Sequence, residues 1–238
     1  MGYNLQGIVR RTTLNALNQF EKTGVVTERL SNMNTPGYKA VRFEEVMHEQ
    51  GYATSVIRTD HSQGSHQVTD NPLDVSIKGP GFIPVTNKSG EIHYTRAGSF
   101  TVNKEGMIVT NAGDVVGSGI VIDADYEKLE IKPDGRVLTY RTLLSEPEER
   151  GVIPLVNFVN PEGLKEIGNN KFAKTEESGD ALLVLEHSRM AQRHTERANV
   201  DVFASVNEIM RTNASLLAST TLLGAIDKMY EKAINIRQ

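Results

Sequence analysis

Apolar positions at helical spacing occupy both ends of the chain. Residues 1–33 contain no proline and carry apolar side chains three or four positions apart, which favours an amphipathic helix. Pro36 disfavours helix at the residue before it, and Gly37 permits a positive φ beyond the helix end. The sequence therefore predicts a first helix that ends before Pro36.

A second helical pattern covers residues 198–237 and is unusually apolar. No charged residue lies between Thr212 and Ile226, so this stretch is not solvated on all sides. An apolar side chain also recurs every seven residues, which is typical of helices that pack on other helices. The members of this repeat are Val202, Ile209, Leu216, Leu223 and Tyr230.

Short β-rich runs fill the middle of the chain. Runs such as 74–77, 82–86 and 93–102 are separated by turn sequences rich in Gly, Asn and Asp. Many short strands with no long helix between them predict mostly antiparallel sheets. Residues 40–70 are polar and charged, and we interpret them as an extended connector.

These patterns predict an α+β fold in which long N- and C-terminal helices, a coiled-coil-like pair, flank a mainly antiparallel all-β domain. The expected parts are a helix in 1–36, an extended connector in 37–72, a β-rich domain in 73–185 and a helix in 186–238. Both helices carry more apolar surface than one pair can bury, so we expect them to pack together and then against further copies. An ordinary α+β domain, with both helices on the sheet, is the alternative. The predicted self-assembly interface consists of Leu5, Ile8, Leu17, Val202, Ile209, Leu216, Leu223 and Tyr230.

Composition narrows the functional classes. The 238 residues carry a formal net charge of −4, which does not favour nucleic acid or an anionic membrane as a partner. The absence of Cys excludes disulfides, thiolate metal sites and Cys nucleophiles. No apolar run approaches the ~20 residues of a membrane helix, and the N-terminus lacks the features of a cleaved secretory signal.

No motif in the chain favours catalysis or a cofactor. The glycines in 113–119 are not followed by Lys-Ser/Thr, so they are better interpreted as turn glycines than as a phosphate loop. Lys128 stands where a calcium loop that starts at Asp123 would need glycine. His187 and His194 could share a helix face but lack a third ligand. We therefore expect no enzyme activity, no cofactor and no metal site.

Five segments in the same order resemble bacterial flagellar rod and hook proteins. Residues 30–39 (LSNMNTPGYK) resemble the N-terminal signature of the family, and its motif residues here are Asn32, Asn34, Thr35, Pro36, Gly37, Tyr38 and Lys39. Residues 71–82, 94–102, 158–170 and 198–202 resemble later family segments, and 158–170 are most similar to the distal-rod member. Glu28 and Arg29 stand where the family usually has two Asn, and 213–217 and 182–196 also depart from its pattern.

The resemblance implies a structural subunit of the flagellar basal-body rod, with the distal rod as the expected position. Such proteins are exported without a cleaved signal by the flagellar type III apparatus and assemble helically with other rod and hook proteins. Their terminal helices form an inner tube and their β domain an outer layer, and the tube transmits torque. The expected location is thus the basal body in the periplasm, with no nucleic acid partner and no membrane insertion. A proximal-rod or hook-type paralogue is the first alternative, and a monomeric α+β ligand-binding module is the second.

Two local roles follow from the residues themselves. Gly37 is expected to have φ > 0 beyond the first helix, and Tyr38 to pack its ring at the junction. Asn199 and Asp201 are candidate caps for the last helix, because their side-chain oxygens can accept hydrogen bonds from its first N–H groups.

Overall fold

The structure is a computed structural model that describes residues 5–47, 53–183 and 188–235. The chain forms two compact units, which are treated separately below. The helical unit comprises Met1–Asn32, Ala40–Thr59 and Val200–Gln238, and the β unit comprises Met33–Lys39 and Asp60–Asn199.

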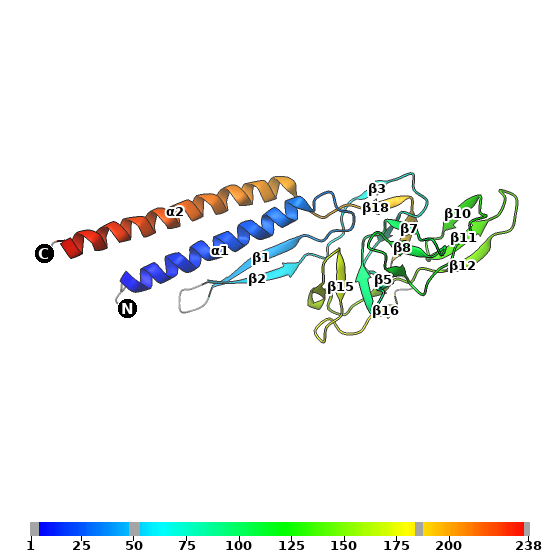
Figure 1. The fold of residues 1–238 in the computed structure, drawn as a ribbon, viewed down its shortest axis with the longest axis horizontal. Helices are drawn as coiled ribbons and strands as arrows, with labels where there is room; N and C mark the ends of the chain where they lie inside the picture. Colours follow the sequence, from blue (N-terminus) through cyan, green and yellow to red (C-terminus); the bar gives the residue numbers. More distant parts are fainter. Residues whose placement is uncertain (1–4, 48–52, 184–187, 236–238) are drawn as a thin grey trace. The chain divides into compact units, whose positions relative to one another are not determined.

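Two long helices run antiparallel in the helical unit (Figure 1). They are α1 (Leu5–Ser31) and α2 (Val202–Asn235). Asn15 Nδ2 of α1 lies 3.3 Å from Ser219 Oγ of α2, and Arg29 Nη1 lies 3.0 Å from Glu208 Oε2. Neither helix combines the length and hydropathy that crossing a membrane requires, among the residues that the structure describes.

The start of α2 is capped by one of the two predicted residues. Asp201 Oδ1 accepts a hydrogen bond of 2.9 Å from the backbone N–H of Ala204, which confirms the prediction for Asp201. The side-chain Nδ2 of Asn199 donates to the backbone oxygen of Asp60 at 2.8 Å, within the β unit. A capping role for Asn199 stays a prediction.

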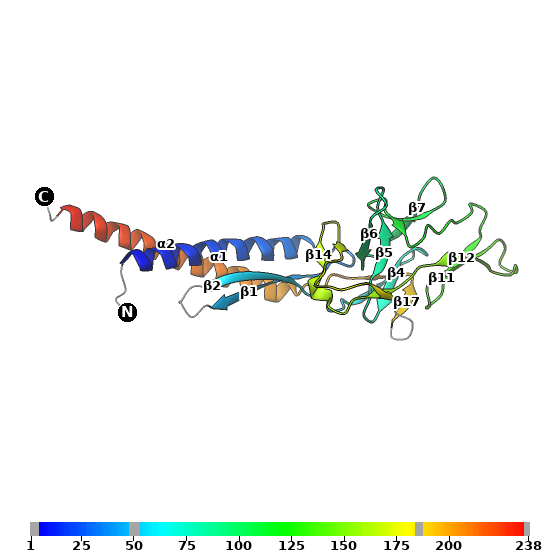
Figure 2. The ribbon, with the colours of Figure 1, turned by 90° about the horizontal axis from the view of Figure 1, so that it is seen from below.

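A two-stranded antiparallel hairpin accompanies α1 (Figure 2). It consists of β1 (Val41–Met47) and β2 (Ala53–Thr59), with Phe43 opposite Ile57. Arg29 of α1 donates to the backbone oxygen of Val41 at 2.6 Å and so fastens the first strand to the helix. The sequence indicated only an extended connector here, because charged side chains interrupt the alternation of these strands.

The largest sheet of the β unit is antiparallel throughout, in the order β14-β15-β6-β5-β9-β8-β7. Its strands are β5 (Ile83–Thr86), β6 (Ile92–Thr95), β7 (Phe100–Val102), β8 (Ile108–Thr110), β9 (Val115–Val116), β14 (Lys165–Glu166) and β15 (Lys171–Ala173). The run 93–102, which the sequence presents as one segment, is divided between β6 and β7. The divide contains Arg96, whose side chain is buried, and Gly98, which lies against the backbone of Val75.

Smaller antiparallel sheets complete the β unit. One contains β10 (Lys128–Ile131), β11 (Arg136–Tyr140) and β12 (Glu148–Val152). Three strand pairs join β13 (Val156–Asn157) to β16 (Leu182–Leu183), β4 (Val75–Lys78) to β17 (Arg189–Gln192), and β3 (His66–Val68) to β18 (His194–Glu196). A 3-10 turn spans Pro161–Gly163. Residues 189–192 and 194–196, assigned from sequence to the C-terminal helical part, are thus strands, and α2 begins only at Val202.

Two buried clusters hold the β unit together. The larger one is aliphatic apart from Phe100 and Met190, and it includes Val75, Ile83, Ile108 and Val137. The smaller one is aromatic and contains Phe82, Tyr94, Phe158 and Phe172 together with Val156 and Leu164. The predicted α+β class, with helices at both ends of the sequence and a mostly antiparallel β region between them, is confirmed.

Candidate assembly surface and buried ion cluster

A line of small and polar side chains forms the buried face of the helix pair. On α2 the buried residues recur every seven positions and are Ser205, Thr212, Ser219 and Ile226. The buried residues of α1 have the same spacing and are Thr12, Gln19 and Val26. We call these two lines the seam. A seven-residue interval keeps a line of side chains on one side of a helix that packs along a partner.

The two threonine hydroxyl groups of the seam are satisfied within their own helices. Thr12 Oγ1 donates to Ile8 O at 3.0 Å, and Thr212 Oγ1 donates to Glu208 O at 2.7 Å. Most seam side chains thus bury little apolar surface, and burial of apolar surface is what contributes most packing energy. The two helices of a single chain therefore gain only modest stability from each other.

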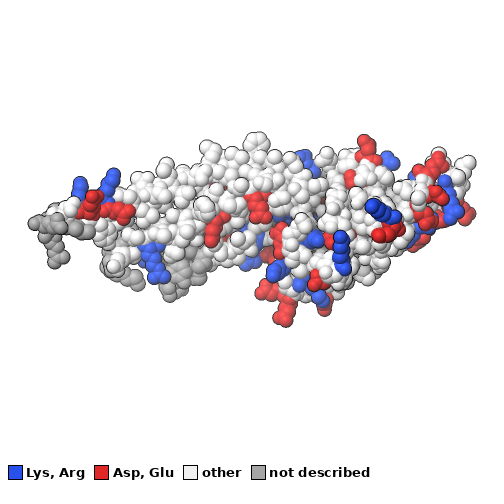
Figure 3. Space-filling view, viewed as in Figure 1, with Lys and Arg blue, Asp and Glu red and all other residues white. Residues whose placement is uncertain are grey.

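A line of large apolar side chains on α2 faces away from the seam. Phe203, Met210 and Leu217 follow each other at seven-residue intervals and are 85%, 65% and 68% exposed. Each precedes a seam residue by two positions, which corresponds to about 200° around the helix. On the face of the molecule seen in Figure 3, the middle of α2 is almost free of charge. We call these three residues the outer line.

The interface residues predicted from sequence on α2 flank the seam. Val202 and Tyr230 are exposed, whereas Ile209, Leu216 and Leu223 are partly buried between the seam and solvent. On α1, Leu17 is exposed and Ile8 is partly buried. The side chain of Leu5 lies outside the described part of the structure. The participation of these residues in self-assembly stays a prediction.

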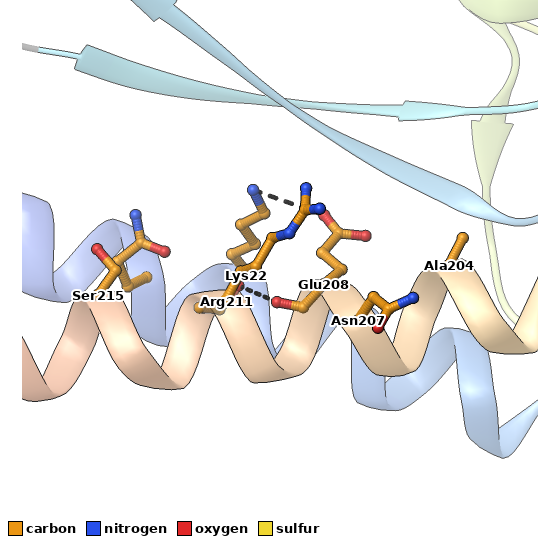
Figure 4. A pocket seen from close by; sticks show the side chains of 8 residues that line it. Lys22, Ala204, Asn207, Glu208, Arg211 and Ser215 are labelled. Carbon is orange, nitrogen blue, oxygen red and sulfur yellow. Dashed lines mark hydrogen bonds and ion pairs between the residues drawn. The ribbon is translucent and has the colours of Figure 1, made fainter.

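A groove of about 590 Å³ runs along the side of the helix pair. Figure 4 shows the side chains of Lys22, Glu208 and Arg211 extending to the same side of the helices. Glu208 binds two cations, with Lys22 Nζ at 3.6 Å and Arg29 Nη1 at 3.0 Å. The lining is thus polar and of mixed charge, with Gln19, Ala204, Asn207, Thr212 and Ser215 completing it.

A buried ion cluster lies in the β unit. Glu196 Oε1 lies 2.7 Å from Lys39 Nζ, and Glu196 Oε2 lies 2.9 Å from the guanidinium of Arg96. The side chains of Lys39 and Glu196 are fully buried and that of Arg96 is 3% exposed. Burial lowers the pKa of Lys39, and the nearby positive charge of Arg96 acts in the same direction, while Glu196 opposes both. No pattern in the sequence predicted this cluster, although Lys39 and Arg96 each stand in a motif segment.

The N-terminal motif packs tightly against the β unit. Gly37 has a φ of +71°, as predicted, and a Cβ at this position would lie 2.5 Å from the backbone nitrogen of Ala97. Tyr38 is buried, and Asn170 Nδ2 donates to the backbone oxygen of Pro36 at 3.1 Å. The motif residues therefore have a structural role in the turn that follows α1.

Comparison with known proteins shows similarity to flagellar rod and hook proteins. Residues 76–139 match the family model described as “Flagellar hook protein FlgE/F/G D1 domain”. The “Flagellar basal-body rod protein FlgG” of Caulobacter vibrioides is 29% identical over 242 residues, which cover 90% of this chain and 92% of that protein. FlgG of Bacillus subtilis is 24% identical with coverages of 91% and 94%. The “Flagellar hook-basal body complex protein FlhP” of Bacillus subtilis is 27% identical with coverages of 95% and 97%. This chain is accordingly similar over most of its length to flagellar rod and hook proteins.

Proposed function

We propose that this protein is a structural subunit of the flagellar basal-body rod that self-associates through its helical unit. The observation that carries the proposal is the outer line of α2, an apolar surface exposed in the single chain. Three large apolar side chains exposed to water along one line of a helix do not stabilise a monomer. Such an exposed apolar surface is typical of an interaction site.

The weak seam supports the same proposal. Because the helices of one chain bury mainly small polar side chains against each other, most of their apolar surface remains available to other copies. Assembly would then supply the packing energy that the single chain lacks, with α1 and α2 paired in a coiled-coil-like manner. The partly buried Ile209, Leu216 and Leu223 would lie at the border of that interface.

The distal rod is the position that we favour. Seven relatives with coverage of 86% or more of this chain carry the name FlgG, a basal-body rod protein. The match to FlhP, which covers more of both chains, supports a hook–basal-body paralogue as the second candidate. In either case the role is structural rather than enzymatic.

Further parts of the proposal concern the setting of this subunit. The helices would line an inner tube and the β unit an outer layer, so that the polymer transmits torque. Neighbours would be other rod and hook proteins, delivered like this chain by the flagellar type III apparatus to the periplasmic part of the basal body. The proposed domain roles are those of an inner helical domain and an outer β domain.

Incorporation into basal bodies tests the proposal. An epitope-tagged chain, expressed in its own bacterium in place of the chromosomal copy, should be recovered with purified hook–basal bodies. The double variant Met210→Asp, Leu217→Asp should remain in the soluble fraction, because assembly would bury two unpaired carboxylates. Its thermal unfolding as a purified monomer should match the wild type, since both positions are exposed.

A variant with the same added charge on the β unit is the control. Ala112 and Ser118 are exposed turn residues on either side of β9, and Ala112→Asp, Ser118→Asp should assemble normally. Recovery of the Met210, Leu217 variant at the wild-type level would refute assembly through the outer line. Absence of the wild-type chain from basal bodies would refute the rod function itself.

A further inference from the structure

Lys39 and Glu196 of the ion cluster belong to segments of the β unit that continue into the helical unit along the sequence. Three segments of the β unit lead to or from the helical unit: Met33–Lys39, the stretch that begins at Asp60, and the stretch that ends at Asn199. Every covalent connection between the units belongs to one of these segments. We call them the connecting segments.

Hydrogen bonds join the connecting segments to each other in all three combinations. Lys39 Nζ donates to the backbone oxygen of Ser62 at 2.6 Å, which ties the first segment to the second. The backbone N–H of Gly37 donates to the backbone oxygen of Glu196 at 2.7 Å, which ties the first to the third. The backbone N–H of Gly64 donates to Glu196 Oε1 at 2.9 Å, which ties the second to the third.

Arg96 fixes the connecting segments to the rest of the β unit. Its guanidinium binds Glu196 and also donates to the backbone oxygens of Gly81 at 2.7 Å and Gly79 at 3.2 Å. These two glycines belong to the turn between β4 and β5. A planar guanidinium with several acceptors holds both position and orientation, which a single ammonium group would not.

Stability alone does not account for three charged side chains at this place. Removing a carboxylate and two cations from water costs several kcal/mol per ion, and well-packed apolar residues often stabilise a fold as well or better. What the ions add is direction, because each bond requires a particular placement of its partner. A carboxylate that accepts bonds from three different chain segments cannot keep all of them if one segment shifts.

We propose that Lys39, Arg96 and Glu196 act as positioning residues of a clamp that holds the three connecting segments together, so that load passing between the units is carried by this cluster. The role in carrying load rests on the rod function proposed above. The clamp itself is a property of the single chain and can be tested without flagella.

Hydrogen exchange of single amides in the purified full-length protein provides the test. The amides of Gly37, Gly64 and Arg197 report on one connecting segment each, and Arg197 N–H donates to Ser65 O at 2.8 Å. Lys39→Met should speed exchange at all three amides by about tenfold or more, while leaving the amide of Phe82 unchanged. This variant keeps the Arg96–Glu196 pair, so no buried charge loses its last partner. Glu196→Gln should have a larger effect at the same three amides.

Lys171→Met is the matched control, because Lys171 also forms a largely buried ion pair in the β unit, with Asp114 at 2.7 Å. It should leave exchange at Gly37, Gly64 and Arg197 at the wild-type rate. Faster exchange confined to the segment that carries the substitution would overturn the clamp, since that pattern means three independent local contacts. Equal acceleration by the control variant would overturn it as well.

Swimming under load separates the clamp from the rod function. Cells that carry Lys39→Met should assemble basal bodies normally but swim more slowly than wild type as methylcellulose raises the viscosity. Wild-type speed at high viscosity, together with fast exchange at the connecting segments, would overturn the load-bearing role. If the wild-type chain is absent from basal bodies, the rod function fails, whereas the exchange results on the clamp remain valid.

Discussion

His61 makes the stability of the β unit depend on pH. Its ring packs edge-on against Phe82 and Phe172, with centroid distances of 5.5 and 5.2 Å. Neither ring nitrogen has a hydrogen-bond partner within the described residues. Burial lowers the pKa of His61 from 6.5 to about 4, and the positive charges of Lys39 and Arg96 add to this effect, with Asp60 and Glu162 opposing it.

The sign of the effect follows from proton binding. The native state keeps His61 neutral down to about pH 4, whereas the unfolded chain binds this proton near pH 6.5. The unfolded state therefore holds more protons between these values, and stability is complete above pH 6.5 and is lost as the pH falls toward 4. Between pH 7.5 and pH 5 these two pKa values correspond to a loss of about 2 kcal/mol in the free energy of unfolding.

Urea unfolding at pH 7.5 and pH 5, followed by tyrosine fluorescence, measures this difference. His61→Phe should remove the loss of about 2 kcal/mol, because phenylalanine preserves the ring contacts and does not titrate. A smaller slope of the same sign should remain, since burial also lowers the pKa of His66. The loss should persist in 0.5 M NaCl, because burial is its main cause and salt screens buried groups weakly.

NMR titration of the His61 ring gives the decisive result. A midpoint near 6.5 in the folded protein would refute the reasoning. An unchanged pH dependence in the His61→Phe variant would refute it too, because another group would then be responsible.

Three glycine substitutions should change stability, two of them lowering it and one raising it. Gly98→Ala should destabilise the β unit by about 3 kcal/mol, because a Cβ at this position would lie 1.6 Å from the backbone oxygen of Val75 in a strand. Urea unfolding measures this loss of stability. Gly168 has a φ of +84° and open space around the position of an added Cβ, so Gly168→Ala should lower the free energy of unfolding by only about 1–2 kcal/mol. Equal losses for Gly98→Ala and Gly168→Ala would contradict this prediction. Gly24 lies in α1, and an added Cβ would meet no atom within 4 Å outside the neighbouring backbone of the helix. Gly24→Ala should therefore stabilise this helix by about 0.5–1 kcal/mol. The melting temperature followed by circular dichroism at 222 nm should rise, and a lower value would contradict the prediction.

Local patterns alone determined much of the fold. The first helix ends at Ser31, shortly before Pro36, and the last begins directly after Asp201, because proline and a capping carboxylate act on the backbone next to them. The antiparallel β region follows from short runs between turn residues, and the positive φ of Gly37 follows from its place after a helix. Each of these features depends on residues that are close in sequence.

The hairpin of β1 and β2 could be recognised only in the tertiary structure. Glu45 breaks the alternation of apolar and polar residues that runs from Val41 to Glu44. The pairing of Phe43 with Ile57 and the bond from Arg29 to Val41 reveal ordered strands. The ion cluster is even less predictable from the sequence than the hairpin. Arg96 and Lys39 lie 100 and 157 positions from Glu196 in the sequence, so no local pattern relates them.

The seven-residue repeat of α2 shows where sequence periodicity stops being informative. The sequence established that α2 is a helix with an apolar repeat and with no charge between Thr212 and Ile226. Every position of such a helix belongs to some line at seven-residue spacing, so periodicity cannot decide which line faces α1. The tertiary structure decided it in favour of Ser205, Thr212 and Ser219, because small side chains let two helices approach closely, and this leaves the larger Met210 and Leu217 exposed.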